Sequence, residues 1–208
     1  MGFGINETKA WIQHVSESYE KHKAYLTELD QAIGDGDHGI NMSRGFKEAA
    51  QKTAQASYVD LGSLFKDIGM TLLGKIGGAS GPLYGTVFLK AALPLKDKQE
   101  MTISDLIEAL SASLEGLKQR GKAAIGDKTM IDVWEPAIHF LEIHKDELDW
   151  EEFTDFVEER MLDTSHLEAK KGRASYLGPR SVGHIDPGAA SSYYFFNELA
   201  NIFKGARI

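Results

Sequence analysis

The chain has 208 residues, of which 31 are acidic and 23 are lysine or arginine, so its net charge is −8 at pH 7. It contains no cysteine, which excludes disulfide frameworks, thiolate zinc sites, iron–sulfur clusters and cysteine nucleophiles. The acidic balance argues against a nucleic-acid partner, and no apolar run is long enough to cross a membrane. The N-terminus lacks the basic and apolar regions of a signal peptide, so a soluble, cytoplasmic protein is expected.

Hydrophobic periodicity predicts a mostly helical chain. The first helix is expected from Asn6 to Leu29, and the sixth, from Thr129, is expected to kink or restart at Pro136. The other predicted helices cover Met42 to Gln55, Asp60 to Leu72, Ser80 to Leu93, Thr102 to Leu117, Asp149 to Met161, and Asp186 to Phe203. Alternating β-branched residues are almost absent, so strands are not expected. One all-α domain of about eight helices, spanning residues 1–208, is the predicted architecture.

The 21 glycines exceed the roughly 15 expected from a typical usage of about 7%. Fourteen of them lie in four of the seven connections between predicted helices, namely Gly34, Gly36 and Gly39; Gly74, Gly77, Gly78, Gly81 and Gly85; Gly121 and Gly126; and Gly172, Gly178, Gly183 and Gly188. The other three connections contain none. Glycines also end helices without any binding role, but the three plain connections end helices without them.

These four glycine-rich connections alternate with the plain ones along the chain. In an up-and-down array of helices, alternate connections lie at the same end, so the glycine-rich connections are expected to gather there. Each one leads into a helix N-terminus, where free N–H groups and the positive end of the helix dipole face outward. That end of the molecule is therefore predicted to bind an anion, and phosphate is the most frequent natural ligand of such sites.

The first glycine-rich connection carries Asp30, Asp35 and Asp37 within eight residues. Such carboxylates repel one another when they are brought together, and a hard cation such as Mg²⁺ or Ca²⁺ would relieve that repulsion. Aspartate clusters in loops are also common as solvated surface groups. The other three glycine-rich connections are predicted to bind phosphate at the same end of the molecule, and this favours the metal-binding interpretation.

Three familiar ligand-binding motifs are matched only in part, so the sequence does not predict any of them. Gly34-Asp-Gly-Asp-His-Gly39 matches the dinucleotide-binding spacing, but a helix rather than a strand precedes it. Gly69-Met-Thr-Leu-Leu-Gly-Lys75 resembles a phosphate-binding P-loop but continues with Ile76 where Ser or Thr is needed. An EF-hand would require glycine where Ile40 stands.

The fourth glycine-rich connection is basic in an otherwise acidic protein. It carries Lys170, Lys171, Arg173, Arg180 and His184. Surface lysines and arginines are usually only solvated, but their position at the predicted phosphate end makes Arg173 and Arg180 candidates for anion contacts. For His184, as for His38 in the first connection, hydrogen bonding and proton transfer both stay open.

Several segments together resemble the nucleotide-binding L subunit of dihydroxyacetone kinase, the DhaL family. They are Ile33 to Phe46, Gly69 to Leu73, Gly77-Gly-Ala-Ser-Gly-Pro82, Arg120-Gly-Lys122, Gly126-Asp-Lys-Thr-Met130, Lys171 to Gly178, and His184-Ile-Asp-Pro-Gly188. They cover essentially the whole chain in the order typical of the family. Each segment alone is weak evidence for the resemblance, but the segments together are specific for this family.

The resemblance implies an antiparallel up-and-down barrel that binds ADP or ATP, with two Mg²⁺ ions on Asp30, Asp35 and Asp37. Met130 would suit an adenine face, Arg180 would offset the charge of the transferring phosphoryl group, and Asp35 and Arg180 are the predicted catalytic residues. The positions that match the nucleotide pocket are His38, Gly39, Ile40, Asn41, Gly78, Ala79, Ser80, Gly121, Met130, Arg180, Asp186, Pro187 and Gly188.

The resemblance also implies partners. The family's sugar-binding subunit holds dihydroxyacetone and is not part of this chain, so it is expected as a separate protein. A stand-alone L subunit resembles the phosphotransferase-system type, in which a phosphohistidine carrier rephosphorylates the bound ADP. Two alternatives stay open: the nucleotide-binding module of a related kinase with another acceptor, such as a fatty-acid kinase, or a non-enzymatic protein that senses nucleotide or metal.

Overall fold

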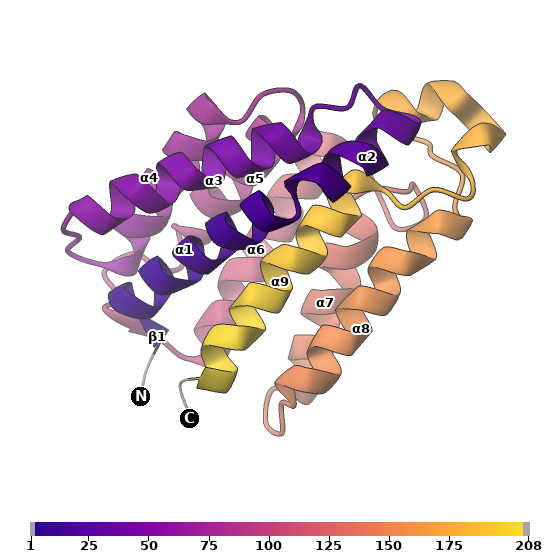
Figure 1. The fold of residues 1–208 in the computed structure, drawn as a ribbon. Coiled ribbons are helices and arrows are strands. Elements are labelled where there is room, and N and C mark those ends of the chain that lie inside the picture. Colours follow the sequence, from indigo (N-terminus) through magenta and orange to yellow (C-terminus); the bar gives the residue numbers. More distant parts are fainter. Residues whose placement is uncertain (1–2, 206–208) are drawn as a thin grey trace.

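The computed structural model describes residues 3–205, and most of these residues are helical (Figure 1). The α-helices are α1 (Ile5–Lys21), α2 (Lys23–Ile33), α3 (His38–Gln55), α4 (Leu61–Lys75), α5 (Ser80–Ala91), α6 (Ile103–Gly121), α7 (Ile131–His144), α8 (Trp150–Asp163) and α9 (Pro187–Gly205). Two 3₁₀ segments, η1 (Thr164–His166) and η2 (Arg173–Ser181), lie between α8 and α9. The all-α prediction is confirmed.

The helices contact one another in a closed cycle. From α3 to α9 each helix packs on the next one along the chain, α1 packs on α3, and α9 returns to α1. Figure 1 shows α9 lying between α1 and α8. The antiparallel up-and-down barrel that the resemblance implies stays a prediction.

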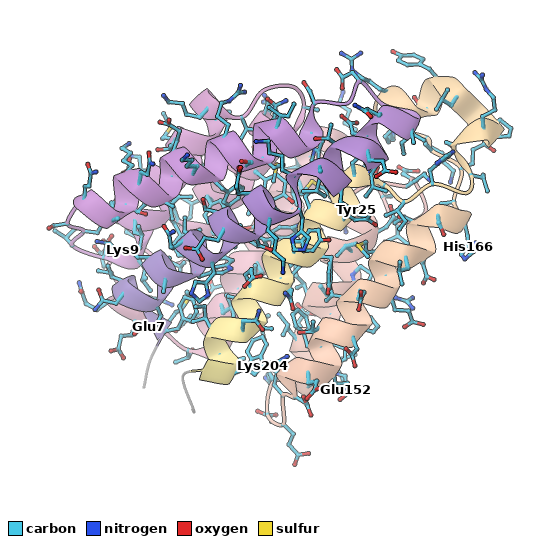
Figure 2. The ribbon with its side chains drawn as sticks, in the orientation of Figure 1. Glu7, Lys9, Tyr25, Glu152, His166 and Lys204 are labelled. Atoms are coloured by element: carbon cyan, nitrogen blue, oxygen red, sulfur yellow. The ribbon has the colours of Figure 1, made fainter. Side chains whose placement is uncertain are left out.

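The centre of this cycle is filled by aromatic side chains. Trp11 of α1 and Phe195 of α9 have ring centroids 4.7 Å apart, and Phe195 also contacts Phe88 of α5 and Trp134 of α7. All four side chains are buried, and burying each one contributes roughly 2–3 kcal/mol. The core therefore joins helices from opposite sides of the cycle. Charged side chains such as Lys9, Glu152 and Lys204 lie on the outside (Figure 2).

The single N-terminal helix predicted from Asn6 to Leu29 is instead two helices, divided at His22. That residue leaves helical geometry, with ψ at 11°, and its ring stacks on Tyr194 of α9 at a centroid distance of 4.1 Å. Neither glycine nor proline marks the break in the sequence. This contact with α9 joins residues far apart in the sequence, so local periodicity cannot show it.

Other boundaries also differ from the prediction. Helix α3 begins at His38 rather than Met42, and α7 runs through Pro136 without restarting. Two short strands, β1 (Phe3–Gly4) and β2 (Glu100–Met101), form an antiparallel pair, although no strand was expected. Each strand immediately precedes a helix N-terminus, and segments this short carry no detectable alternation.

The connections gather at two ends of the molecule. Figure 1 shows the α2–α3 and α8–α9 connections at one end, and the α7–α8 turn at the other. The plain α3–α4 and α5–α6 connections meet where the Leu61 N–H donates to the Lys98 carbonyl at 2.8 Å. Within residues 3–205, no helix is both long and apolar enough to cross a membrane.

Candidate functional site

One cavity of about 520 Å³ is lined by residues from all four glycine-rich connections. The clustering predicted from the glycine distribution is therefore confirmed. The volume falls in the range typical of small-molecule sites. The lining includes Asp30, Asp35, Asp37 and His38; Gly78, Ala79 and Ser80; Arg120, Gly121, Lys128, Thr129 and Met130; and Lys171, Arg173, Asp186, Pro187 and Gly188.

Three carboxylates converge on one side of this cavity. Asp30, Asp35 and Asp37 each offer an oxygen, and these oxygens lie within 4.8 Å of one another. Asp30 is buried, and one of its oxygens accepts hydrogen bonds from the main-chain N–H groups of Asp37 at 2.8 Å and His38 at 3.1 Å. Carboxylates held this close repel one another unless a cation lies between them. The donor set fits a hard divalent ion such as Mg²⁺.

Two glycines shape the turn that carries these aspartates. Gly36 has a φ of +74°, which lies in the left-handed region that favours glycine. At Gly34, a Cβ atom would lie 2.0 Å from an Asp30 carboxylate oxygen. The turn can therefore bring Asp30 against its own backbone only because residue 34 has no side chain.

His38 connects the acidic connection to the second glycine-rich connection. Its Nδ1 lies 3.0 Å from the Ser80 hydroxyl, and its Nε2 is buried with no hydrogen-bonding partner among residues 3–205. Burial lowers the pKa of His38 to about 4, against a smaller raising effect of the Asp30 carboxylate. The imidazole is therefore neutral near pH 7.

The second glycine-rich connection approaches α3 closely. A Cβ atom at Gly77 would lie 2.8 Å from the Asn41 amide oxygen, and Arg44 donates to that same oxygen at 2.7 Å. Gly78 has a φ of +62° and directly precedes Ala79 and the first residues of α5. The main chain at residues 78–80 is thus presented to the cavity beside Asp37.

The cavity lining also includes several apolar side chains. Met130, which is 5% exposed, lines the cavity together with Leu83, Leu117, Ile131 and Pro187. A Cβ atom at Gly121 would lie 3.6 Å from Leu83, and one at Gly188 would lie 3.6 Å from Met130. The glycines therefore leave space next to the apolar side chains, which suits a flat aromatic ring.

Asp186 marks the entry to α9 within the cavity wall. Its carboxylate accepts a hydrogen bond from the Ala189 N–H at 2.7 Å, and its own N–H donates to the Thr164 hydroxyl at 3.0 Å. Burial raises the pKa of Asp186 to about 7, and the nearby Asp132 carboxylate adds to this shift while Lys128 opposes it. The charge of this wall therefore changes near neutral pH.

Four of the predicted site residues do not line the cavity. Gly39 packs against α2, where a Cβ atom would lie 2.2 Å from the Lys23 carbonyl oxygen. Asn41 is buried against the second connection, and Ile40 is 48% exposed. Arg180 is exposed on η2, outside the lining, whereas Arg173 lines it. The remaining predicted residues are brought together as expected.

The sequence pattern also missed residues that line the cavity. Lys128 is 1% exposed and forms part of the lining, although lysine is rarely buried. Its only signal was a place in the third glycine-rich connection, next to Met130. Tyr84 of α5 also lines the cavity, and its hydroxyl bonds to Ser191 of α9 at 2.9 Å.

The chain matches the DAK2 domain model over residues 32–201. It is 47% identical to the "PEP-dependent dihydroxyacetone kinase 1, ADP-binding subunit DhaL" of Listeria innocua, covering 91% of this chain and 92% of that protein. It is 40% identical to the corresponding Escherichia coli subunit, covering 91% of this chain and 93% of that protein. The fold and site thus define a DAK2-type domain, and the chain belongs to the DAK2 domain family.

A solved structure shares this fold. The crystal structure of the C. freundii dihydroxyacetone kinase in complex with AMP-PNP and Mg²⁺ matches with a TM-score of 0.74 and 27% sequence identity. The match covers 93% of this chain but 33% of that kinase. This chain therefore corresponds to about one third of the C. freundii kinase.

Proposed function

We propose that this chain is the ADP- and ATP-binding subunit of a dihydroxyacetone kinase. The observation that carries the proposal is one cavity whose lining combines three converging carboxylates with apolar side chains around Met130, here called the apolar slot. A nucleotide has that same division between charged phosphates and a flat base. The names of the Listeria innocua and Escherichia coli relatives support two parts of this proposal, the binding of ADP and the kinase reaction.

Asp30, Asp35 and Asp37 would hold Mg²⁺, and we propose two ions for the three carboxylates. When bound, Mg²⁺ neutralises phosphate charge, which is the main requirement of phosphoryl transfer. The main chain at residues 78–80 and the N-terminus of α5 would hold phosphate oxygens. The neutral His38, held by Ser80, would offer its Nε2 to the same ligand.

The apolar slot beside Met130 would hold the adenine ring. Gly121 and Gly188 keep the slot open, and the Asp186–Gly188 turn forms its wall. Gly39, Ile40 and Asn41 would support the pocket from the first turn of α3 rather than line it.

Asp35 and Arg180 are the proposed catalytic residues. Asp35 would act through the metal. Arg180, exposed on η2, would reach the transferring phosphoryl group once nucleotide and partner are both bound, and it would offset the developing charge. Arg173 already lines the cavity and is the nearer cation.

We propose that dihydroxyacetone is presented by a separate sugar-binding subunit, and that a phosphohistidine carrier of the phosphotransferase system rephosphorylates the bound ADP. The names of the relatives support the dependence on such a donor. In this arrangement residues 1–208 act as one nucleotide-binding domain, and the reaction takes place in the cytoplasm.

Two measurements test this function. Mass spectrometry of the purified protein should detect co-purifying ADP. Mixed with a sugar-binding subunit, a phosphocarrier system and dihydroxyacetone, the protein should then produce dihydroxyacetone phosphate. Nucleotide binding without any turnover in the complete mixture would contradict the kinase assignment and favour a sensing role.

A further inference from the structure

Lys128 is the only buried lysine among residues 3–205. Its ammonium group donates hydrogen bonds to the main-chain carbonyls of Thr164 at 2.8 Å and Leu167 at 3.1 Å, and to the carbonyl of His184. An ammonium group has three donors, so this side chain is fully engaged with backbone and has none left for a ligand.

The three carbonyls belong to opposite ends of the α8–α9 connection. Thr164 and Leu167 stand at its beginning, and His184 stands at its end. The ammonium group therefore holds the two ends of this long connection together from the α6–α7 side. The Lys170 N–H donates to the Asp127 carbonyl at 3.0 Å, which joins the same two connections once more.

The clamped connection and the turn that follows it both contribute residues to the cavity lining. Between the clamped ends, Arg173 lies 2.8 Å from Asp35. Just past the clamped end, after His184 and Ile185, comes the turn Asp186–Gly188, which lines the cavity. Any loosening of the ends would displace both parts of the lining.

A buried ammonium is costly unless it is paired. Burial lowers the pKa of Lys128, and the carboxylates of Asp186 and Asp132 oppose that change. The residue also adopts a φ of +59°, which is unfavourable for a side chain with a Cβ atom. An apolar residue here would leave three carbonyls without their donor, so the cation has a role that packing alone does not explain.

We propose that Lys128 is a positioning residue of the nucleotide site, which clamps the α8–α9 connection and thereby fixes Arg173 and the Asp186–Gly188 turn around the ligand. The identity of the ligand rests on the function proposed above. The clamp itself rests only on the contacts of the free protein. An experiment can therefore contradict the clamp without contradicting the proposed function, and the reverse.

Limited trypsin digestion and calorimetry of the full chain test the clamp in the variant Lys128→Met. Exposed trypsin sites lie inside the connection at Lys170, Arg173 and Arg180, and cleavage there should become faster under native conditions. The affinity for Mg-ADP should fall about tenfold, the lower end of the effect of removing a supporting residue. Lys118→Met is the matched control, since Lys118 pairs with Glu135 at 2.8 Å outside the cavity.

The absence of cysteine allows a chemical rescue. Lys128→Cys introduces the sole thiol of the chain, and aminoethylation in denaturant followed by refolding restores an ammonium group at this position. The modified protein should regain slow cleavage and the affinity of refolded wild type, while the unmodified variant should not. This comparison decides the question even if Lys128→Met does not fold.

Two results would overturn the proposal. One is wild-type cleavage and affinity in folded Lys128→Met. The other is an aminoethylated protein that behaves like the unmodified Lys128→Cys variant while treated wild type recovers. If wild type itself binds no Mg-ADP, the proposed function fails, and the cleavage rates alone then decide the clamp.

Discussion

The Arg173 guanidinium lies 2.8 Å from the Asp35 carboxylate and joins the α8–α9 connection to the acidic turn. Both side chains are partly exposed, at 69% and 38%, so the pair contributes about 1 kcal/mol or less. Its importance lies in its position, because Arg173 occupies an oxygen of a residue proposed to hold Mg²⁺. In the free protein, the cation and Arg173 would compete for Asp35.

Removing this competitor should strengthen metal binding. Arg173→Gln is expected to raise the affinity of the nucleotide-free protein for Mn²⁺, a spectroscopic substitute for Mg²⁺, by at most about fivefold, the equivalent of such an ion pair. Electron paramagnetic resonance titration of free Mn²⁺ measures this affinity directly. A weaker affinity in the variant would show instead that Arg173 orients Asp35 for the metal.

Gly34→Ala should damage the acidic turn. The new methyl group would lie 2.0 Å from an Asp30 carboxylate oxygen, so Asp30 must turn away from its two main-chain donors. Calorimetry should show weaker Mg-ADP binding. Gly74→Ala is the matched control, because a Cβ atom there meets nothing within 4 Å; equal losses in both variants would refute the steric explanation.

The acidic turn and the glycine-rich connections were predictable because both depend on local chemistry. Aspartates within eight residues are visible in the sequence, and the alternation of glycine-rich and plain connections follows from helix order. The break at His22 and the burial of Lys128 were not predictable. Each involves a contact with residues far along the chain, Tyr194 in one case and the carbonyls of the α8–α9 connection in the other.

The predicted site residues also divide into those whose place follows from the local sequence and those whose place depends on distant contacts. Gly78 and Met130 lie in the cavity wall because the connections that contain them converge. Asn41 and Arg180 belong to the right segments, but their orientation depends on packing. Asn41 is engaged by Arg44, and Arg180 falls on the exposed side of η2.

The hydroxyl of Tyr84 should stabilise the junction between α5 and α9 beneath the cavity. It bonds to Ser191 at 2.9 Å in a fully buried setting. Tyr84→Phe is expected to lower the free energy of unfolding by about 1 kcal/mol, the usual net value of such a bond, as measured by urea denaturation. Tyr176→Phe, at an 88% exposed position, should leave stability unchanged. A Tyr84→Phe variant as stable as wild type would contradict this role.

Asp186 should make stability depend on pH. Its folded-state pKa is about 7, whereas an unfolded aspartate titrates near 4. Between these values the folded state holds the extra proton, so this group's contribution to stability falls as pH rises from about 4 to 7 and is lost above that. In Asp186→Asn, the decrease in melting temperature from pH 5 to pH 8 should be smaller than in wild type. An identical decrease in both proteins would show that Asp186 titrates normally.

Calorimetric titration with Mg-ADP tests the central claim, that the acidic turn holds the nucleotide through a metal. Wild type and the control Asp155→Ala, whose exposed carboxylate on α8 lies outside the cavity, should bind with the same affinity. Asp35→Ala should remain folded by circular dichroism and show no measurable binding. Unchanged Mg-ADP affinity in folded Asp35→Ala would contradict the account.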